Sequence, residues 1–346
     1  MTDSGTFLAR TVRSRWLTKG LGLAIGTYRA LDAVLAGIAG MITAKGWSAG
    51  QNGWGNAILG DDEPDASIGP MLTRDDAPDL FNILEDLARQ LGGGLPTEVR
   101  LSYLPACGVL DLGSQSGYPR QVLIIGLPCF LILRTDELRA VLAHELAHLT
   151  LEDAVFTRDI VNFSQELHRK MRRGADWSDW VNPRYWLARS ISFGLAAATA
   201  SVSRAMEYRA DDWSAACFGT RPLASALEKL AIVQPIFREV LFIYDPIARP
   251  AVSVYAYFLR VWKRLPAVEY KRLRKRFVKG IKPDRFDPHP PVYKRIKRLT
   301  GPEWTTGRWA MPAAKLLAAP EELVTLMNNR LYAEQIEPTS VFRKNQ

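Results

Sequence analysis

The segment AHELAHL at residues 143–149 constrains this chain more than any other feature of its sequence. It places His144 and His148 four residues apart, and a helix brings residues at this spacing onto one face, one turn apart. Two imidazoles so placed can bind one metal ion, and zinc suits such nitrogen ligands. Glu145 follows the first histidine, so its carboxylate can reach a water molecule at the metal and accept its proton. The segment therefore predicts a hydrolytic zinc site.

The residues around this segment predict the helix that carries it. Thr135 is a suitable N-cap residue, and Asp136 and Glu137 place negative charge in the first turn, where the helix dipole favours it. The apolar side chains that would bury the rest of the helix surface are Val141, Leu142, Leu146 and Leu149. We expect a helix that begins at Thr135 and continues through the two histidines.

A catalytic zinc site needs a third protein ligand and one open position, and the segment at 203–216 offers that ligand. Glu207 could complete a site of two histidines and one glutamate. Asp211 lies four residues later on the same predicted helix face, where it could accept the free N–H of a ligating imidazole and fix its tautomer. The spacing alone leaves a surface helix with interspersed charges as an alternative.

The segment DPHPPVYKRIKRL (287–299) contains a third candidate histidine, His289, and Arg295 six residues later. The Pro290–Pro291 pair is expected to set the entry to a helix at Val292. Near a metal, His289 and Arg295 could donate hydrogen bonds to the oxyanion of a tetrahedral intermediate. The remaining histidine, His168, has no such context and is expected at the surface.

The rest of the chain predicts a mostly helical α+β fold with a small sheet. Leucines at helical intervals predict a helix over 76–91, and two strand candidates follow at 97–104 and 121–127, separated by turns that contain Gly and Ser. The chain then reads as helical from Glu207 to about residue 265, and again over 312–335.

Two apolar stretches raise the question of a membrane. Residues 21–43 are long enough to span a bilayer, but Arg29 and Asp32 lie in the middle, and each costs about 2.5–3.5 kcal/mol there. The stretch at 190–202 is too short to span alone and is expected to be a core helix. We expect neither to be a simple spanning helix, and a Gly/Asp/Pro-rich linker at 49–70 follows the first.

Positive charge is concentrated in one part of the chain. The net charge is +9, but Arg260–Thr300 alone contains fifteen Lys/Arg and three acidic residues, so the remainder is negative. The densest run is 271–279, which could meet an anionic membrane surface. A solvated helix face is the alternative, and since nothing beside the run suggests base readout, no nucleic acid is expected.

The cysteines and the N-terminus bear on localisation. Cys107, Cys129 and Cys217 are odd in number and fit no metal pattern or disulfide framework, so we expect reduced thiols. The polar start MTDSGTF does not resemble a secretory signal. We expect a cytoplasmic protein, with peripheral membrane association as the alternative.

Three segments together carry a resemblance to a known family. HELAH at 144–148, EYRAD at 207–211 and HPPVYKRI at 289–296 occur in the order found in the zinc peptidases grouped around HtpX, the CAAX prenyl-protein endopeptidase and the mitochondrial Oma protease. The resemblance covers roughly residues 75–300, and the motifs are specific as a set. The chain departs from the family pattern at 105–113, where PACGVLDLG replaces an Asn-Ala-Phe loop, and in having no clear spanning helix.

The resemblance implies a zincin-like fold and a gluzincin site. It implies one zinc ion per chain, held by two histidines and one glutamate: His144, His148 and Glu207. Glu145 would act as general base, with Asp211 behind the ligands. His289 and Arg295 would steady the transition state. The strand near 121–127 would pair with an extended polypeptide substrate, as peptides add to sheet edges elsewhere.

These inferences give a domain plan and a function. We expect a helical, apolar N-terminal region with a linker at residues 1–70, a zinc metallopeptidase domain at 71–300 and a C-terminal helical extension at 301–346. The expected function is a zinc-dependent endopeptidase. The alternative is a catalytically silent, zinc-stabilised protein that binds a membrane or a partner through the basic segment at 260–300.

Overall fold

The computed structural model describes much of the chain between residues 68 and 333. The described residues are 68–115, 118–150, 183–244, 252–280, 287, 289–303 and 310–333. Nearly all of the predicted N-terminal region at 1–70, including the apolar stretch at 21–43, lies outside them, as does His168.

The chain divides into two compact units, each described by itself. Unit 1 contains residues 1–62, 154–206 and 284–289, and unit 2 contains residues 63–153, 207–283 and 290–346. All strands in the described part of the chain belong to unit 2.

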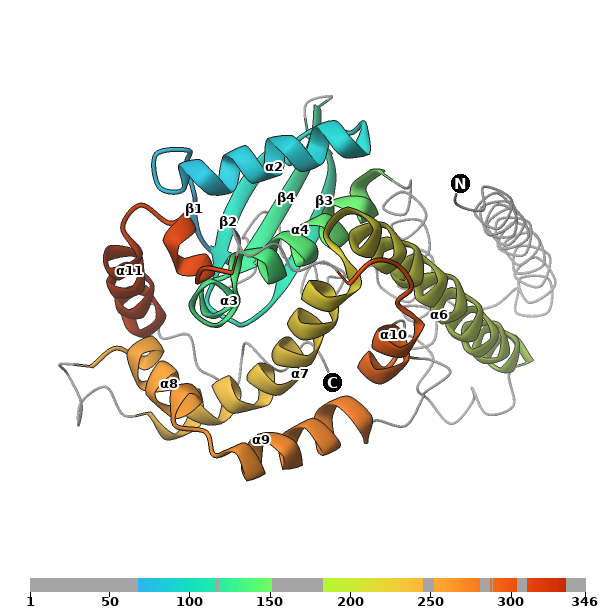
Figure 1. Cartoon of the computed structure of the whole chain (residues 1–346). Helices are drawn as coiled ribbons and strands as arrows, with labels where there is room; N and C mark the ends of the chain where they lie inside the picture. Colours follow the sequence, from blue (N-terminus) through green and yellow to red (C-terminus); the bar gives the residue numbers. More distant parts are fainter. Residues whose placement is uncertain are drawn as a thin grey trace, which may run out of the picture. The chain divides into compact units, whose positions relative to one another are not determined.

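Unit 2 contains a four-stranded mixed sheet (Figure 1). Its strands are β1 (Ile68–Met71), β2 (Glu98–Ser102), β3 (Cys107–Gln115) and β4 (Tyr118–Gly126), in the order β1-β2-β4-β3. Strands β2 and β4 pair in parallel, and the other two pairings are antiparallel. The predicted strands at 97–104 and 121–127 are confirmed as β2 and β4.

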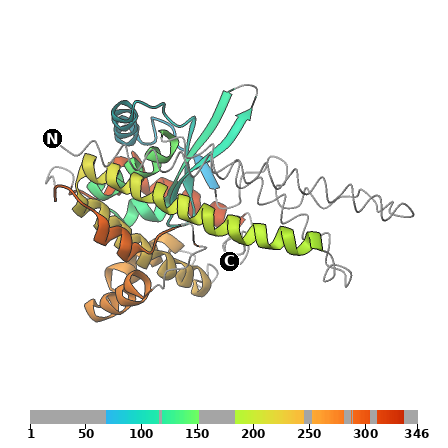
Figure 2. The same ribbon diagram turned by 90° about the vertical axis from the view of Figure 1, so that its right-hand side faces the viewer.

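Strand β3 corrects two predictions. The region between the predicted strands was expected to be turns, yet it forms the long antiparallel hairpin of β3 with β4, from Cys107 opposite Ile125 to Gln115 opposite Tyr118. The ladder with β4 stabilises residues whose glycines alone suggest a turn. Because β4 lies between β2 and β3, both of its edges are occupied, so the prediction that 121–127 pairs with a substrate is wrong. Figure 2 shows the hairpin extending away from the helices.

The helices before the first histidine have clear causes in the sequence. Helix α2 (Pro78–Leu91) buries Leu80, Leu84 and Leu87 and ends at Gly92, which adopts a left-handed φ of 65°. Helix α3 (Leu127–Ile132) follows β4 directly, and α4 (Thr135–Thr150) begins three residues later. The predicted helices at 76–91 and from Thr135 are confirmed.

Helices dominate the rest of the described residues. They are α6 (Pro183–Phe218), α7 (Thr220–Ile243), α8 (Val254–Lys263), α9 (Ala267–Leu273) with the π-helical η2 (Arg274–Lys279), α10 (Val292–Arg298), the 3₁₀ turn η4 (Ala313–Leu316) and α11 (Pro320–Ala333). Gly219, at φ 88°, separates α6 from α7. Helix α6 belongs to unit 1 through Met206 and to unit 2 from Glu207. Within the described ranges, no helix combines the length and apolar composition that crossing a bilayer requires.

One hydrophobic core joins the sheet to its helices. Leu101 and Ile125 of the sheet, Leu142 of α4 and Phe237 of α7 are fully buried members of it. Burying each such side chain contributes about 1.5–3 kcal/mol. The structure thus confirms a mostly helical α+β fold with a small sheet. Met327 of α11 belongs to the same core, so this helix of the predicted 301–346 extension packs with unit 2. The domain boundaries themselves stay a prediction.

Candidate metal centre

Helix α4 is held at its first turn by a buried carboxylate. Glu137 accepts hydrogen bonds from Lys229 Nζ at 2.7 and 2.8 Å and from Ser225 Oγ at 2.6 Å, which ties α4 to α7. It also accepts one from the Arg134 N–H, as the glutamate of a capping box does. The prediction that Thr135 caps the helix is wrong: it is the first helical residue, and its N–H and hydroxyl both donate to the Met311 carbonyl.

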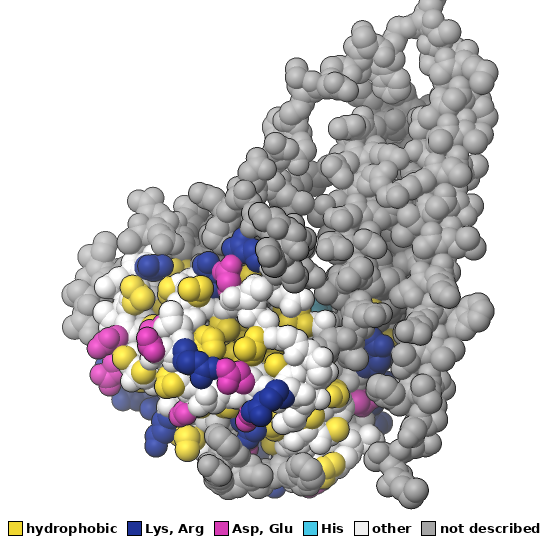
Figure 3. Space-filling model, turned by 90° about the horizontal axis from the view of Figure 1, so that it is seen from above, with side chains coloured by type: hydrophobic (Ala, Val, Ile, Leu, Met, Phe, Trp, Pro, Cys, Tyr) yellow, Lys and Arg dark blue, Asp and Glu magenta, His cyan; other side chains and the backbone are white. Residues whose placement is uncertain are grey.

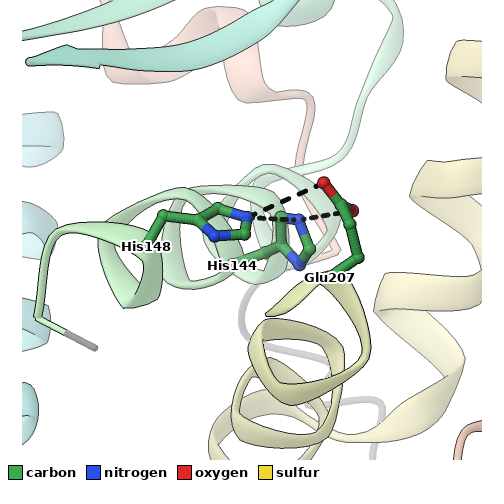
Figure 4. Close-up of side chains that lie close together, drawn as sticks. All are labelled: His144, His148 and Glu207. Carbon is green, nitrogen blue, oxygen red and sulfur yellow. Dashed lines mark hydrogen bonds and ion pairs between the residues drawn. The ribbon is translucent and has the colours of Figure 1, made fainter. Parts of the chain in front are cut away.

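The two histidines meet on one side of α4, as their spacing predicts. Their Nε2 atoms lie 3.3 Å apart, with the rings nearly perpendicular (Figure 4). His144 is buried, whereas a quarter of the His148 side chain is exposed. The pair therefore lies at the boundary between the core and solvent.

Glu207 completes the group from α6. Its carboxylate oxygens lie 3.5 Å from His144 Nε2 and 3.9 Å from His148 Nε2, and Figure 4 shows the three side chains converging. One ligand atom from each of the three residues lies within 4.8 Å of the others, which is compatible with one shared metal ion. Two nitrogens bound at about 2.0–2.1 Å to a tetrahedral zinc would lie about 3.3–3.4 Å apart, so this donor set fits zinc.

Asp211 contacts the other nitrogen of His144. Its Oδ1 lies 3.1 Å from Nδ1, so the Nδ1–H can donate to the carboxylate and leave the Nε2 lone pair for a metal. Burial alone would lower the pKa of His144, but the contacts with Asp211 and Glu207 outweigh it and raise the pKa to about 9. These carboxylates therefore favour the protonated imidazole in the metal-free protein, and a metal ion competes with that proton.

Arg295 of α10 lies against the same carboxylates. Its guanidinium nitrogens lie 3.0 Å from Glu207 and 2.7 and 2.9 Å from Asp211. Its Nη2 lies 3.2 Å from Nε2 and 3.5 Å from Nδ1 of His144, and these near-equal distances place it off the lone pair of either nitrogen. Burial would lower the pKa of Arg295, but Asp211 and Glu207 raise it above its ordinary value, so the guanidinium stays charged. The residue balances the buried acids.

Glu145 follows His144 on α4, and its surroundings shift the pKa of its carboxyl. Burial raises the pKa of its carboxyl above the ordinary value, while His144 and His148 lower it.

Cys107 of β3 is close enough for the Glu145 charge to act on it. A hydrogen bond with Cys129, together with burial, holds the pKa of the Cys107 thiol well above its usual range. The three cysteines are free thiols, as predicted.

Of the predicted site residues, His289 is the one that does not belong to unit 2. It lies in unit 1, whereas the other six belong to unit 2. Its side chain is exposed and its backbone N–H donates to Asp287 Oδ1 at 2.8 Å. Its role stays a prediction.

One contact that positions the site was missed from the sequence. Ser214 Oγ donates to the Ala140 carbonyl at 2.6 Å, and this buried bond fixes α6 against α4 one turn before His144. The signal was present, because Ser214 follows Glu207 and Asp211 at the i+7 and i+3 positions, on the same helix face.

Comparisons with known proteins agree with this geometry. The model of peptidase family M48 matches residues 122–303, which is more than half of the chain and includes both histidines, Glu207 and Arg295. The chain belongs to peptidase family M48. No solved structure gave a significant match.

Curated relatives of this M48 member are named as proteases. A "Protease HtpX homolog" of Thermococcus sibiricus is 26% identical over 255 residues, covering 66% of this chain and 75% of the relative. Another, of Dictyoglomus turgidum, is 28% identical over 260 residues, covering 67% and 72%. A "Protease HtpX" of Tolumonas auensis is 31% identical over 170 residues, covering 44% and 57%. The resemblance expected from the three motifs is confirmed.

Proposed function

We propose that this M48 member is a zinc-dependent endopeptidase. The observation that carries the proposal is the convergence of His144, His148 and Glu207, with Asp211 on the far nitrogen of His144. Three protein ligands, rather than four, are the pattern of catalytic zinc sites. A zinc ion held there would supply Lewis-acid chemistry, which polarises a peptide carbonyl and makes water easier to deprotonate.

Glu145 is proposed to move the proton. It accepts a proton from the attacking water and later donates it to the leaving amine, which a carboxyl with a raised pKa does better than an ordinary one. Asp211 holds the Nδ1–H of His144, and Arg295 holds Asp211 and Glu207. These contacts fix the ligands before substrate arrives, so little reorganisation accompanies the reaction.

The proposed substrate is a polypeptide bound in extended form. Within the described part of the sheet, β3 is an edge strand, and it contacts the catalytic helix α4. A peptide that adds to this edge would be held mainly by backbone hydrogen bonds, which carry little sequence information. We therefore propose β3, rather than β4, as the strand that receives substrate.

The proposal is tested by replacing Glu145 with Gln, which keeps the shape of the side chain and removes its basicity. Casein cleavage should fall about 10²–10⁴-fold while bound zinc is unchanged. Glu239→Gln, at an exposed position on α7, is the matched control and should cleave casein like wild type. Undiminished cleavage by the Glu145 variant would contradict the proposal.

The alternative, a silent zinc-stabilised binding protein, predicts zinc retention without turnover in the wild type. Such a protein has no need for Glu145 beside its first histidine. Membership of a peptidase family and the intact ligand set both support the enzyme.

A further inference from the structure

The basic run at 271–279 folds onto one surface of unit 2. Helix α9 continues into η2, and one side of this segment packs on α7: Tyr270 Oη donates to Glu228 at 3.1 Å, Arg274 Nε to Glu228 at 2.7 Å, and Val278 is buried. Figure 1 shows the segment along α7, on the side away from the sheet. One side of α9–η2 is therefore committed to the core.

The opposite side carries what we call the basic stripe. Its members are the exposed residues Lys271, Arg272, Lys275, Arg276 and Lys279. Among the described residues, the acid paired with it is Glu269, 3.6 Å from Arg272, whose side chain is 79% exposed. Such an exposed pair leaves the charge of the stripe almost intact.

The stripe differs in charge from the face of the molecule over α2. Residues 260–280 contain nine Lys/Arg and one acid, a net charge of +8, whereas the net charge of the whole chain is +9. The face over α2 instead shows positive and negative side chains interspersed (Figure 3). A local excess of one sign creates a strong field and attracts an extended anionic partner.

The side chains of this surface favour lipid over nucleic acid. It offers no exposed aromatic ring for base stacking, and no amide or hydroxyl side chain for reading base edges, among the exposed residues of α9 and η2. It does include Val268, which is 79% exposed on the same side. An apolar side chain among cations suits the headgroup boundary of a bilayer, where it leaves water while the cations meet lipid phosphates.

We infer that the basic stripe, with Val268, binds this protein to an anionic membrane surface. The contact is electrostatic, so it weakens as salt screens it, and it leaves the metal centre unchanged. This inference does not depend on peptidase activity.

The test is cosedimentation of the full chain with phosphatidylcholine vesicles that either contain or lack phosphatidylserine. Wild type should bind only the vesicles that contain phosphatidylserine. Lys271→Gln/Lys275→Gln/Lys279→Gln should bind them about a hundredfold more weakly, since each cation near such a surface contributes about 1 kcal/mol. Replacing the same three lysines with Arg should retain binding, and unchanged melting temperatures would show that the variants fold.

A matched control removes the same charge elsewhere. Arg89→Gln/Arg221→Gln/Arg330→Gln changes three exposed cations on other helices and should bind like wild type. Equal binding by this control and the stripe variant, whether both weak or both strong, would overturn the inference.

Val268→Ser separates lipid from other polyanions. It should weaken vesicle binding about threefold to tenfold while the charge is unchanged. Wild-type protein that binds an RNA oligonucleotide but not anionic vesicles would overturn the inference in favour of nucleic acid.

Discussion

The metal centre and the basic stripe use charged residues in opposite ways. At the metal centre, Arg295 is 11% exposed and contacts two carboxylates, while at the stripe Arg272 is 79% exposed and has one acid at 3.6 Å. Burial makes each charge at the centre depend on its partners, because an unpaired charge out of water is costly. At the stripe, where the charges are exposed, each charge contributes little to stability. The stripe therefore acts through the electrostatic field that its cations produce together.

The largest expected effect is on catalysis. His148→Ala removes a proposed ligand and should abolish zinc binding and casein cleavage, while the fold persists because His148 lies at the edge of the core. Zinc would be measured by elemental analysis and cleavage by peptide release. Cleavage at the wild-type rate would show that the metal centre does not need His148, and would contradict its proposed role as a ligand.

Arg295→Met should cost the next largest effect. When a chelator has removed the metal, the substitution leaves Glu207 and Asp211 buried without their guanidinium partner. It should then lower the free energy of unfolding by about 3–5 kcal/mol. Arg272→Met removes the same charge at the stripe and should change the free energy of unfolding by less than about 0.5 kcal/mol. Urea denaturation of both variants measures the contrast, and equal effects would break the comparison.

The sequence predicted the local part of the site and missed what depends on packing. His144 and His148 share a face because helix geometry alone requires it, and Glu207 and Asp211 followed from the same spacing on a second helix. From the sequence alone, Arg295 could donate hydrogen bonds to an oxyanion or to a carboxylate equally well. Only the position of α10 brings it against Glu207, 88 residues earlier in the chain.

The errors in the fold have the same cause. Strand β3 was missed because its ladder with β4, rather than its own residues, makes it a strand. The N-cap expected at Thr135 failed because the Met311 carbonyl, far along the chain, takes the hydroxyl. Helix α2, whose apolar spacing and terminal glycine are both local, was predicted closely.

Lys229→Met tests a buried charge pair outside the centre. It removes the cation from Glu137, which is almost fully buried, and should cost about 1–3 kcal/mol of stability, since Ser225 and the Arg134 N–H remain to bind the carboxylate. Lys263→Met, at an exposed position on α8, is the control. A cost at Lys229 no larger than at Lys263 would contradict the role assigned to burial.

A smaller effect than at Lys229 is expected at Ser214. Ser214→Ala removes the buried bond to the Ala140 carbonyl and should cost about 1–3 kcal/mol, at the lower end because one neutral bond is lost. Because this bond docks α6 on α4, zinc affinity should fall with stability. Ser201→Ala, exposed on the same helix, should change neither; an equal change in both variants would remove Ser214 from the account.

The central claim is that Glu207 joins the two histidines of α4 in holding one zinc ion. It is tested most directly by the zinc content of purified wild type and of Glu207→Ala, with casein cleavage measured on the same samples. We expect about one zinc per chain in wild type, little in the variant, and cleavage that follows the metal. One zinc per chain in Glu207→Ala with full cleavage would contradict the account.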